Sequence, residues 1–263
     1  MALFSIVTIT FNSEKTIERT LRSVLSQTYS DYEYIIVDGD SKDSTMDIVR
    51  KYEPLFEGRM KWKSEPDKGI YDAMNKGIMR ATGNIIGIVN SDDWLEDDAL
   101  DNVHKLHLAH SRSESVICAS MYFHYLDGTK QALFSNESLL AKYAKHYEMG
   151  GVRHPATFIS KCLYEKYGLF DTRIKILADT DLILRLFYAG CTFIFSDKIV
   201  TNMDGGGVSN VYYTRALADH KIIINKYAKT KLDYITEVVK RYIKIYIKIL
   251  LPTSLLKAYR SRL

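Results

Sequence analysis

The chain has 263 residues, of which 46% are hydrophobic, so extensive disorder is excluded and one large domain or two small ones can form. Its formal charge of +4 is too small to indicate a protein that coats nucleic acid. The charge is uneven, because the segment from Lys221 onward contains eleven basic and two acidic residues and leaves the preceding residues acidic. A basic end on an acidic body predicts an anionic partner surface, either a membrane or a nucleic acid.

The first hundred residues alternate strand-like and helix-like segments, which is the pattern of a parallel sheet covered by helices. The predicted strands lie at residues 4–10, 34–37, 60–63, 85–89 and 116–125. Helices are predicted between them: the first begins near Ile17, with Asn12 and Ser13 offered as caps, and the third covers residues 71–81.

The second half is predicted to continue the same α/β domain, since no linker rich in Gly, Pro or Ser separates the halves. It contains a segment at residues 150–160 and an amphipathic helix that carries Asp179 and Asp181. We expect one compact domain over residues 1–221, followed by a basic helical tail over residues 222–263.

The cysteines and the start of the chain predict a cytoplasmic location. Cys118, Cys162 and Cys191 lack the paired spacing of a metal knuckle or a redox motif, so we expect free thiols in a reducing compartment. The first residues lack the features of a secretory signal. No apolar stretch reaches about 18 residues, the length that indicates a transmembrane helix.

Polar residues gather where the predicted strands end, at Asn12, at residues 38–43 and at residues 90–93. In open α/β sheets, ligands bind in the crevice at the carboxyl ends of the strands. One nucleotide-sized site could therefore use all three loops.

Asp92 and Asp93 follow a buried strand directly, where carboxylate oxygens could hold a hard divalent cation and leave positions for substrate phosphates. The alternative is that they only cap a helix beginning near Glu96, because aspartates are good caps. Nearby, Asp72, Asn75 and Lys76 share one helical face, a pattern that a solvated surface helix could also show.

Taken together, these segments resemble the family 2 glycosyltransferases, which are inverting enzymes with the GT-A fold. The resemblance covers residues 4–185. It rests on six segments in a fixed order: Thr8-Ile9-Thr10-Phe11-Asn12, Ser26-Gln27-Thr28-Tyr29, Ile36-Val37-Asp38-Gly39 with Ser41, Asp43 and Thr45, Asp67-Lys68-Gly69, Ala81-Thr82-Gly83, and Asn90-Ser91-Asp92-Asp93.

The resemblance implies roles for residues of the first half, 1–110, in binding a nucleotide-sugar donor. Asp38 resembles the carboxylate that holds the uracil, and Asp92 matches the closing aspartate of the metal-binding motif, with Asp93 as a second carboxylate for Mn²⁺ or Mg²⁺. The other residues implied in donor binding are Thr10, Asn12, Asp67, Lys68, Asn90 and Ser91. Asn90 stands where many members have the opening aspartate, so it offers a neutral amide in place of a charge.

The second half, 111–221, is implied to bind the acceptor. An inverting mechanism needs a general base, and alignment of the segment Asp-Leu-x-x-Arg puts Asp179 in that place, although members often have Glu where this chain has Ala178. Asp181 is the alternative base, or a helix-start aspartate favoured by the helix dipole. His154 precedes a segment used near the acceptor, although an isolated His is usually structural, and residues 205–209 could form a loop that closes on the diphosphate or simply mark a turn.

The tail from Leu232 to Leu251 carries Lys240, Lys244 and Lys248 at four-residue spacing, on an otherwise largely apolar helix. Arg241 lies beside them, and Lys257, Arg260 and Arg262 continue the basic cluster. This pattern predicts binding to an anionic membrane surface. The alternative is a helix packed on the catalytic domain or on a second subunit in a homodimer, with its lysines in water.

These observations together predict a metal-dependent hexosyltransferase that is peripheral on the cytoplasmic face of the inner membrane. It would transfer a sugar from a UDP-hexose to a polyprenyl diphosphate-linked saccharide during synthesis of a bacterial surface polysaccharide such as O-antigen, and no nucleic-acid partner is expected. The alternatives are a nucleotidyltransferase, whose basic Gly-rich loop is not found after the first strand, and an inactive binding subunit of a glycan-assembly complex.

Overall fold

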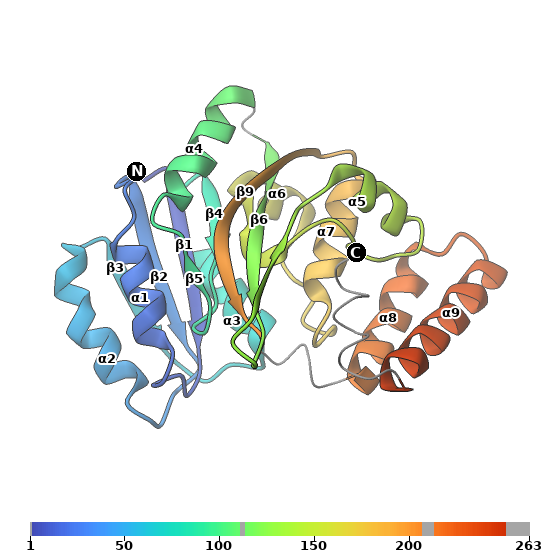
Figure 1. The fold of residues 1–263 in the computed structure, drawn as a ribbon, viewed down its shortest axis with the longest axis horizontal. Helices are drawn as coiled ribbons and strands as arrows, with labels where there is room; N and C mark the ends of the chain where they lie inside the picture. Colours follow the sequence, from blue (N-terminus) through green and yellow to red (C-terminus); the bar gives the residue numbers. More distant parts are fainter. Residues whose placement is uncertain (1, 111–113, 207–212, 251–263) are drawn as a thin grey trace.

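The computed structural model describes residues 2–110, 114–206 and 213–250, and shows one mixed sheet between layers of helices (Figure 1). The elements of the first half are β1 (Phe4–Thr10), α1 (Ile17–Leu25), β2 (Tyr32–Asp38), α2 (Thr45–Tyr52), the 3₁₀ helix η1 (Glu53–Phe56), β3 (Met60–Ser64), α3 (Ile70–Arg80) and β4 (Ile85–Ile88). The second half comprises β5 (Trp94–Leu95), α4 (Ala99–His110), β6 (Ser115–His124), β7 (Lys130–Leu133), α5 (Glu137–Ala144), the 3₁₀ helix η2 (His154–Ala156), β8 (Thr157–Ser160), α6 (Lys161–Tyr167), α7 (Ala178–Tyr188), β9 (Thr192–Asp204), α8 (Tyr213–Tyr227) and α9 (Lys231–Leu250).

The strand order is β3-β2-β1-β4-β8-β6-β9-β5, with β7 paired to β6. The strands β1 to β4 are parallel, as predicted, and the alternation of strands and helices in the first half is confirmed. Beyond β4 the sheet is mixed, because β8 runs antiparallel to both β4 and β6. The pairing places Thr10 opposite Asp38, and Asp38 opposite Ser64, so the carboxyl ends of three strands meet at one edge of the sheet.

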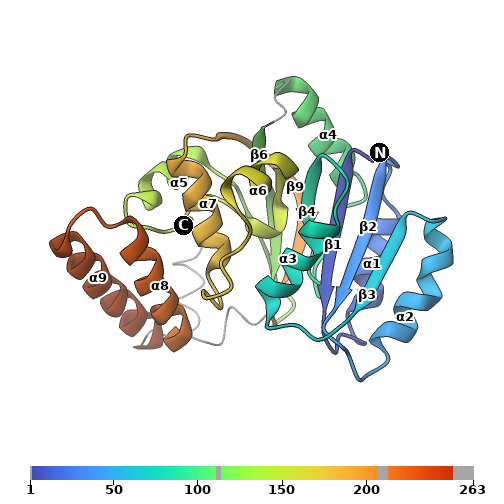
Figure 2. The same ribbon diagram turned by 180° about the vertical axis from the view of Figure 1, so that it is seen from behind.

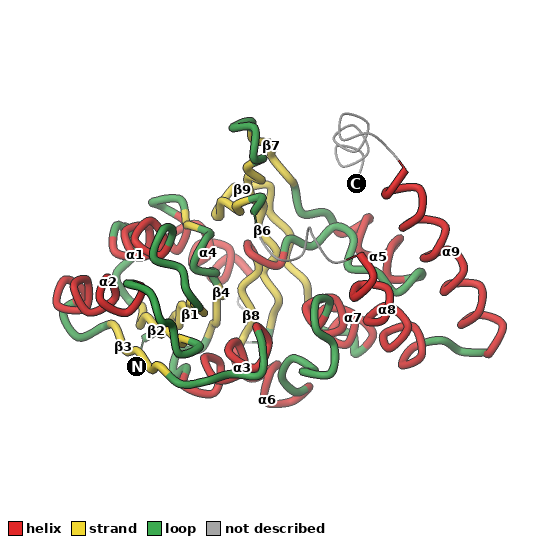
Figure 3. Tube along the Cα trace, turned by 90° about the horizontal axis from the view of Figure 1, so that it is seen from below, coloured by secondary structure: helices red, strands yellow, loops and turns green. Residues whose placement is uncertain are grey.

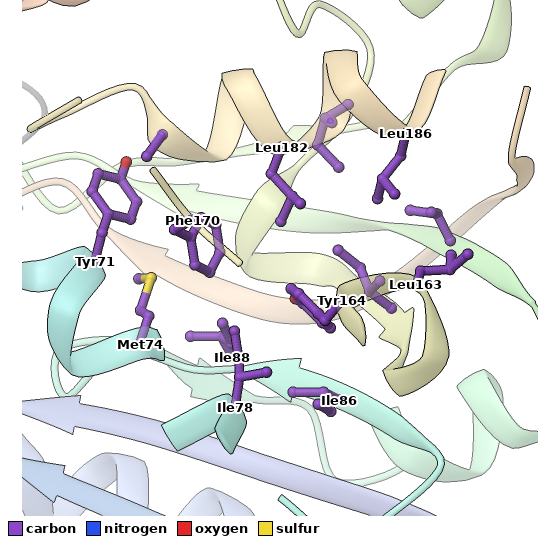
Figure 4. Packing of buried hydrophobic residues seen from close by; sticks show 14 of the residues in the cluster. Tyr71, Met74, Ile78, Ile86, Ile88, Leu163, Tyr164, Phe170, Leu182 and Leu186 are labelled. Atoms are coloured by element: carbon purple, nitrogen blue, oxygen red, sulfur yellow. The ribbon is translucent and has the colours of Figure 1, made fainter. Parts of the chain in front are cut away.

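Each face of the sheet has its own apolar cluster. Helices α1, α2 and α4 cover one face, while α3, α6 and α7 cover the other (Figures 1 and 2). Figure 4 shows the second cluster, in which Tyr71 and Met74 of α3 lie beside Phe170, with Leu182 of α7 on the same face of the sheet. Gly77 brings α3 close to the sheet, since a Cβ there would lie 2.3 Å from Cγ1 of Val7. This packing fixes the start of α3 beside the start of α7.

The expected cap of the first helix is wrong, and so is the alternative that Asp92 and Asp93 cap a helix. The N-cap residue of α1 is Thr16, and no side chain caps the helix, because Asn12 and Ser13 are used to join loops. Asp92 and Asp93 do not cap a helix either, since the two-residue strand β5 intervenes and α4 begins only at Ala99. The competing explanation of these two aspartates as helix caps is thereby removed.

Helices α8 and α9 form an antiparallel pair beside α7 and α5 (Figure 3). The predicted boundary between residues 221 and 222 falls inside α8, whose Ile223 and Ile224 are fully buried in the same cluster as α7. None of the helices described here is both long and apolar enough to cross a bilayer. All three cysteines are free thiols.

Candidate active site

Three loops at the carboxyl edge of the sheet are joined by hydrogen bonds. The backbone N–H of Asn12 donates to Oγ of Ser41 at 2.8 Å, and Oδ1 of Asn12 accepts from the backbone N–H of Lys42 at 2.9 Å. The hydroxyls of Ser13 and Ser91 are 2.8 Å apart, which connects the loop after β1 to the loop after β4. The loops that contain Asn12, Asp38 and Ser91 therefore form one wall, as their places in the sequence predicted.

Asp38 lies at the base of this wall and has no exposed surface. Its carboxylate accepts hydrogen bonds from the backbone N–H of Ser41 at 3.0 Å and from the hydroxyl of Ser64 at 2.6 Å. The reason for these hydrogen bonds is local: the polar loop after β2 needs an acceptor for its own donors, and Asp38 supplies it. The expected contact of Asp38 with the uracil of the donor stays a prediction.

Two buried oxygen atoms at the same edge have no hydrogen-bond partner among the described residues: Oγ1 of Thr10 and Oδ1 of Asn90. Buried polar atoms in folded proteins are nearly always hydrogen-bonded, so such orphans at a sheet edge indicate a place where a ligand completes the bonding. Thr10 is only 4% exposed. Both residues were selected from the sequence, and the structure brings them to neighbouring strand ends.

Asp67 approaches the loop after β2 at Gly39, where a Cβ would lie 2.5 Å from Oδ2 of Asp67. A larger residue at position 39 would therefore have to displace the Asp67 carboxylate. The side chain of Lys68 is exposed, and its backbone N–H donates to Asp72 at 3.0 Å. Phe11, which the sequence did not single out as a separate site residue, is 60% exposed beside Gly39, and it offers an aromatic face at the mouth of this region.

Asp92, Asp93 and Asp204 lie near one another after β4, and Arg19 donates to the backbone carbonyl of Asp92 at 2.6 Å. Burial raises the pKa of Asp92, and the charge of Asp204 raises it further. Burial and the neighbouring Asp92 raise the pKa of Asp93 well above its usual range. Arg19 forms an ion pair with Asp204 at 3.1 Å and stacks over the ring of Trp94. One arginine for three carboxylates leaves an excess of negative charge that a cation would relieve.

The two adjacent aspartates have different surroundings. Asp93 is 1% exposed, and its oxygens accept hydrogen bonds from the backbone N–H of Asp204 at 3.0 Å and from the amide of Asn90 at 3.2 Å. Asp92 is half-buried, and no side chain donates to its carboxylate within the described residues. Asp92 is therefore the carboxylate of this loop that could hold a cation, while Asp93 faces inward and holds the loop. No cluster of three or more potential ligand side chains in metal-binding geometry is found in the described residues, so substrate oxygens would have to complete the coordination.

Asp179 lies at the first turn of α7, in a half-buried position beside α3. The hydroxyl of Tyr71 lies 3.4 Å from Oδ1 of Asp179 and donates to the backbone carbonyl of Ile176. Burial raises the pKa of Asp179, and nearby His154 partly opposes this shift. Burial in turn lowers the pKa of His154, whose ring packs edge-on against Phe170. Asp179 and His154, predicted separately, are thus brought together, and Tyr71 is an addition that the sequence did not reveal.

Asp181 points away from this cluster. It is fully buried and forms ion pairs with Arg185 at 3.0 Å and with Lys226 of α8 at 2.9 Å. These ion pairs join α7 to α8. They add to the expected favourable interaction of Asp181 with the helix dipole at the start of α7. The segment 207–209 of the loop expected to close on the diphosphate lies outside the described residues.

Two members of the basic stripe of α9, Arg241 and Lys244, face the domain, whereas the sequence placed them in solvent or at a membrane. Arg241 is 5% exposed and forms an ion pair with Glu148, and Lys244 also pairs with Glu148, at 2.8 Å. Lys240 remains half exposed and pairs with Glu237 of its own helix. The side chain of Lys248 and the residues from 251 onward lie outside the described part. The reason for the difference is Glu148, a distant acid that the helical spacing could not reveal.

Comparisons with known proteins point in one direction. The model described as "Glycosyl transferase family 2" matches residues 5–166. A PGL/p-HBAD biosynthesis glycosyltransferase of Mycobacterium tuberculosis (strain ATCC 25177 / H37Ra) is 31% identical over 215 residues, which is 79% of each chain. Among solved structures, S. aureus TarS superimposes with a TM-score of 0.69 at 20% identity; the match covers 94% of this chain but only 43% of TarS.

A further solved structure is the mannosyltransferase PcManGT from Pyrobaculum calidifontis in complex with GDP-Man and Mn²⁺, with a TM-score of 0.65 and 16% identity. This match covers 99% of the present chain and 79% of PcManGT. The first 349 residues of TarS have been solved with UDP-GlcNAc. At these identities the structures establish the fold, and the predicted GT-A fold is confirmed.

Proposed function

The chain belongs to glycosyltransferase family 2, and we propose that it transfers a hexose from a UDP-sugar, with inversion, to a polyprenyl diphosphate-linked saccharide during assembly of a bacterial surface polysaccharide. The observation that carries the proposal is the pairing of two regions along one edge of the sheet. One contains the orphaned oxygens of Thr10 and Asn90 beside Asp92. The other contains Asp179. The hydroxyl of Tyr71 lies beside its carboxylate, and Tyr71 directly follows the loop that contains Asp67.

The donor is proposed to lie along the loops after β1, β2 and β4. Exposed Phe11 offers a face on which the base can stack, and the orphaned oxygens of Thr10 and Asn90 accept hydrogen bonds from the nucleoside. Asn12, Asp67, Lys68 and Ser91 complete the proposed set. TarS and PcManGT, which share this fold, have been solved with nucleotide sugars.

Asp179 is proposed as the general base. Its carboxylate would take the proton from the acceptor hydroxyl, while that oxygen bonds to the anomeric carbon from the face opposite the leaving UDP. His154 and Tyr71 would hold Asp179 in place. A divalent cation, Mn²⁺ or Mg²⁺, held by Asp92 would neutralise charge on the departing diphosphate. Asp93 and Arg19 would position the loop that presents Asp92.

The direct test is incubation of the chain with radiolabelled UDP-sugars, Mn²⁺ and detergent-extracted lipid acceptor. Transfer of label to lipid, with inverted linkage by NMR of the product, is the expected result. Binding of UDP-sugar without transfer to any lipid fraction would instead favour an inactive binding subunit. A thermal-shift panel of nucleotide sugars identifies the donor first, because a ligand that binds only the folded state raises the Tm.

Asp38→Ala is expected to weaken UDP binding about tenfold or more while kcat changes little, the scale of losing a hydrogen bond to a charged group. Asp38 is remote from Asp179. Its hydrogen bonds with Ser41 and Ser64 organise the loop beside the proposed pocket for the uracil ring. Isothermal titration with UDP measures the effect. Asp47→Ala is the matched control, since Asp47 is 79% exposed on α2 and should leave UDP affinity unchanged. Unaltered affinity of Asp38→Ala for UDP would show that the uracil ring binds elsewhere.

We further propose that the protein acts as a peripheral enzyme at the cytoplasmic face of the inner membrane, and that α9 provides the contact. The outward face of this helix carries an apolar stripe, defined by Leu232, Ile235, Val239, Tyr242, Ile243 and Tyr246. Both acidic residues of α9 are engaged toward the domain, Asp233 by Tyr147 and Glu237 by His146. The exposed charges beside the apolar stripe, Lys229, Lys231 and Lys240, are all positive, which favours anionic lipid over a second copy of the same basic face.

The chain is therefore expected to co-sediment with vesicles rich in phosphatidylglycerol, and added salt should weaken this binding without abolishing it, because salt screens only the charge contribution. Val239→Asp with Ile243→Asp should release the protein. Leu55→Asp, at an exposed apolar position on η1, is the control and should still bind. A chain that stays in the supernatant at low salt but elutes as a dimer would identify the apolar stripe as a subunit interface.

A further inference from the structure

The helix that carries the proposed base begins without a cap of its own. Leu177 is the N-cap residue of α7, and its side chain forms no capping hydrogen bond. The backbone N–H groups at the start of a helix have no partner within the helix, so they need acceptors from elsewhere. Asp179 lies only two residues after Leu177, so whatever supplies these acceptors also fixes the turn that presents the base.

Asp219 of α8 supplies the acceptors. It is 3% exposed, and its carboxylate accepts hydrogen bonds from three consecutive backbone N–H groups, those of Lys175 at 3.1 Å, Ile176 at 2.6 Å and Leu177 at 3.2 Å. Figures 1 and 3 show α8 beside α7. A carboxylate at this position also interacts favourably with the helix dipole. The cap of α7 is therefore provided by a residue 42 positions after Leu177, on another helix.

The peptide of Ile176 is held from two sides. Its backbone N–H donates to Asp219, and its carbonyl accepts from the hydroxyl of Tyr71 at 2.5 Å. The same hydroxyl lies 3.4 Å from Oδ1 of Asp179. A shift of Ile176 would therefore disturb both the start of α7 and the hydroxyl beside the proposed base.

The other end of the segment that leads into α7 is anchored to α3. The side chain of Asn75 donates to the backbone carbonyl of Phe170 and accepts from its backbone N–H, both at 2.9 Å. The ring of Phe170 in turn packs edge-on against His154. Residues 170–177 are thus fixed by α3 at their start and by α8 at their end. The second anchor comes from one helix of the C-terminal pair.

Resting on the proposed function, we infer that Asp219 is a positioning residue for the general base, which orients the first turn of α7 so that the carboxylate of Asp179 meets the acceptor hydroxyl. Asp219 acts through the backbone of residues 175–177. Transfer is sensitive to such placement, because a displacement of about 1 Å can lower a rate about 10²-fold. The proposed donor loops follow β1, β2 and β4, so donor affinity should not depend on Asp219.

The first measurement needs no substrate. Hydrogen exchange of the full chain, followed by mass spectrometry, compares residues 172–180 in the wild type, Asp219→Asn and Asp219→Ala. Asparagine keeps one acceptor oxygen, whereas alanine keeps none. Exchange in this segment is expected to be about tenfold faster in Asp219→Asn, the scale of one lost hydrogen bond, and faster still in Asp219→Ala.

Asp233→Ala is the matched control. Asp233 is also an aspartate of the C-terminal helices that accepts a hydrogen bond from the domain, but its donor is the hydroxyl of Tyr147. This variant loses a contact between α9 and the domain and leaves the cap of α7 in place. Exchange of residues 172–180 should therefore match the wild type.

Kinetic measurements separate positioning from stability. Asp219→Asn is expected to lower kcat about tenfold and Asp219→Ala about 10²-fold, with KM for the donor and affinity for UDP unchanged. Asp233→Ala should keep the wild-type kcat, even where its Tm falls as far as that of Asp219→Asn. If Asp219→Ala does not fold, Asp219→Asn decides both measurements.

Unchanged exchange in Asp219→Asn would overturn the contact between Asp219 and α7. Faster exchange together with a wild-type kcat, or an equal fall of kcat in Asp233→Ala, would overturn the positioning role. If the wild type itself transfers no sugar while exchange responds as expected, the proposed function fails, and with it the role toward the base, whereas the contact between Asp219 and α7 stands.

Discussion

Asp179→Asn is expected to lower kcat by about 10²–10⁴-fold, the usual contribution of a general base, while affinity for the UDP-sugar is retained. The amide has nearly the same shape but cannot accept the proton of the acceptor hydroxyl. Single-turnover kinetics with saturating donor, together with titration of UDP, separates the two effects. Loss of donor affinity with unchanged kcat would show that Asp179 serves binding.

Asp181→Asn is the matched control for this variant, two residues further along α7. Asp181 is fully buried and paired with Arg185 and Lys226, so its loss should lower the Tm but spare kcat in the folded protein. If Asp181→Asn is instead inactive with full donor affinity and an unchanged Tm, the general base has been assigned to the wrong face of α7.

The pH profile offers a second measurement on Asp179. Burial raises the pKa of this carboxyl, and the base is active only when deprotonated, so kcat should fall as pH decreases through the raised pKa. The fall should begin above the usual Asp value of about 3.9. The residual activity of Asp179→Asn should lack this acidic limb.

Asp92→Asn is expected to reduce transfer about 10²-fold or more, the scale of removing one electrostatic contact to charge that develops in the transition state. Its half-buried carboxylate accepts from no other side chain among the described residues, and its pKa is raised by burial and by Asp204, so a cation nearby has a physical reason to bind. Titration of UDP with and without Mn²⁺ should show that Mn²⁺ strengthens binding to the wild type and no longer does so in Asp92→Asn.

Two further variants test whether the effect is specific to Asp92. Asp98→Asn, an exposed aspartate a few residues further on, should leave both activity and the Mn²⁺ effect intact. Asp93→Asn should lower the Tm, because Asp93 holds the backbone N–H of Asp204 and the amide of Asn90. Full wild-type activity in excess chelator would contradict the assignment of a cation to Asp92.

The sequence predicted the first half of the fold and the gathering of its polar loops, because both depend on short-range patterns. Alternating strands and helices impose parallel pairing, and parallel pairing brings Thr10, Asp38 and Ser64 to one edge whatever the side chains around them are. The GT-A fold, confirmed by comparison, was reached through the order of six such loop segments.

What could not be predicted depends on partners far away in the chain. Asp92 and Asp93 are adjacent in the sequence, and the backbone N–H of Asp204, 111 residues later, holds Asp93 inward together with the amide of Asn90. The same holds for α9, whose helical spacing defines a basic stripe but not its direction. Glu148 decides that direction, because it draws Arg241 and Lys244 toward the domain and leaves the apolar stripe outside.

The ion pairs of Asp181 affect how the C-terminal helices unfold. Opening of α8 alone would remove Lys226 and leave the fully buried carboxylate of Asp181 with only Arg185 to balance it, on the same helix as Asp179. Because uncompensated buried charge is costly, the reactive helix and the proposed membrane-binding pair should behave as a single cooperative unit rather than as modules that open separately. Evolution could therefore not exchange the C-terminal helices of such an enzyme for another anchor without also rebuilding the helix that carries its base.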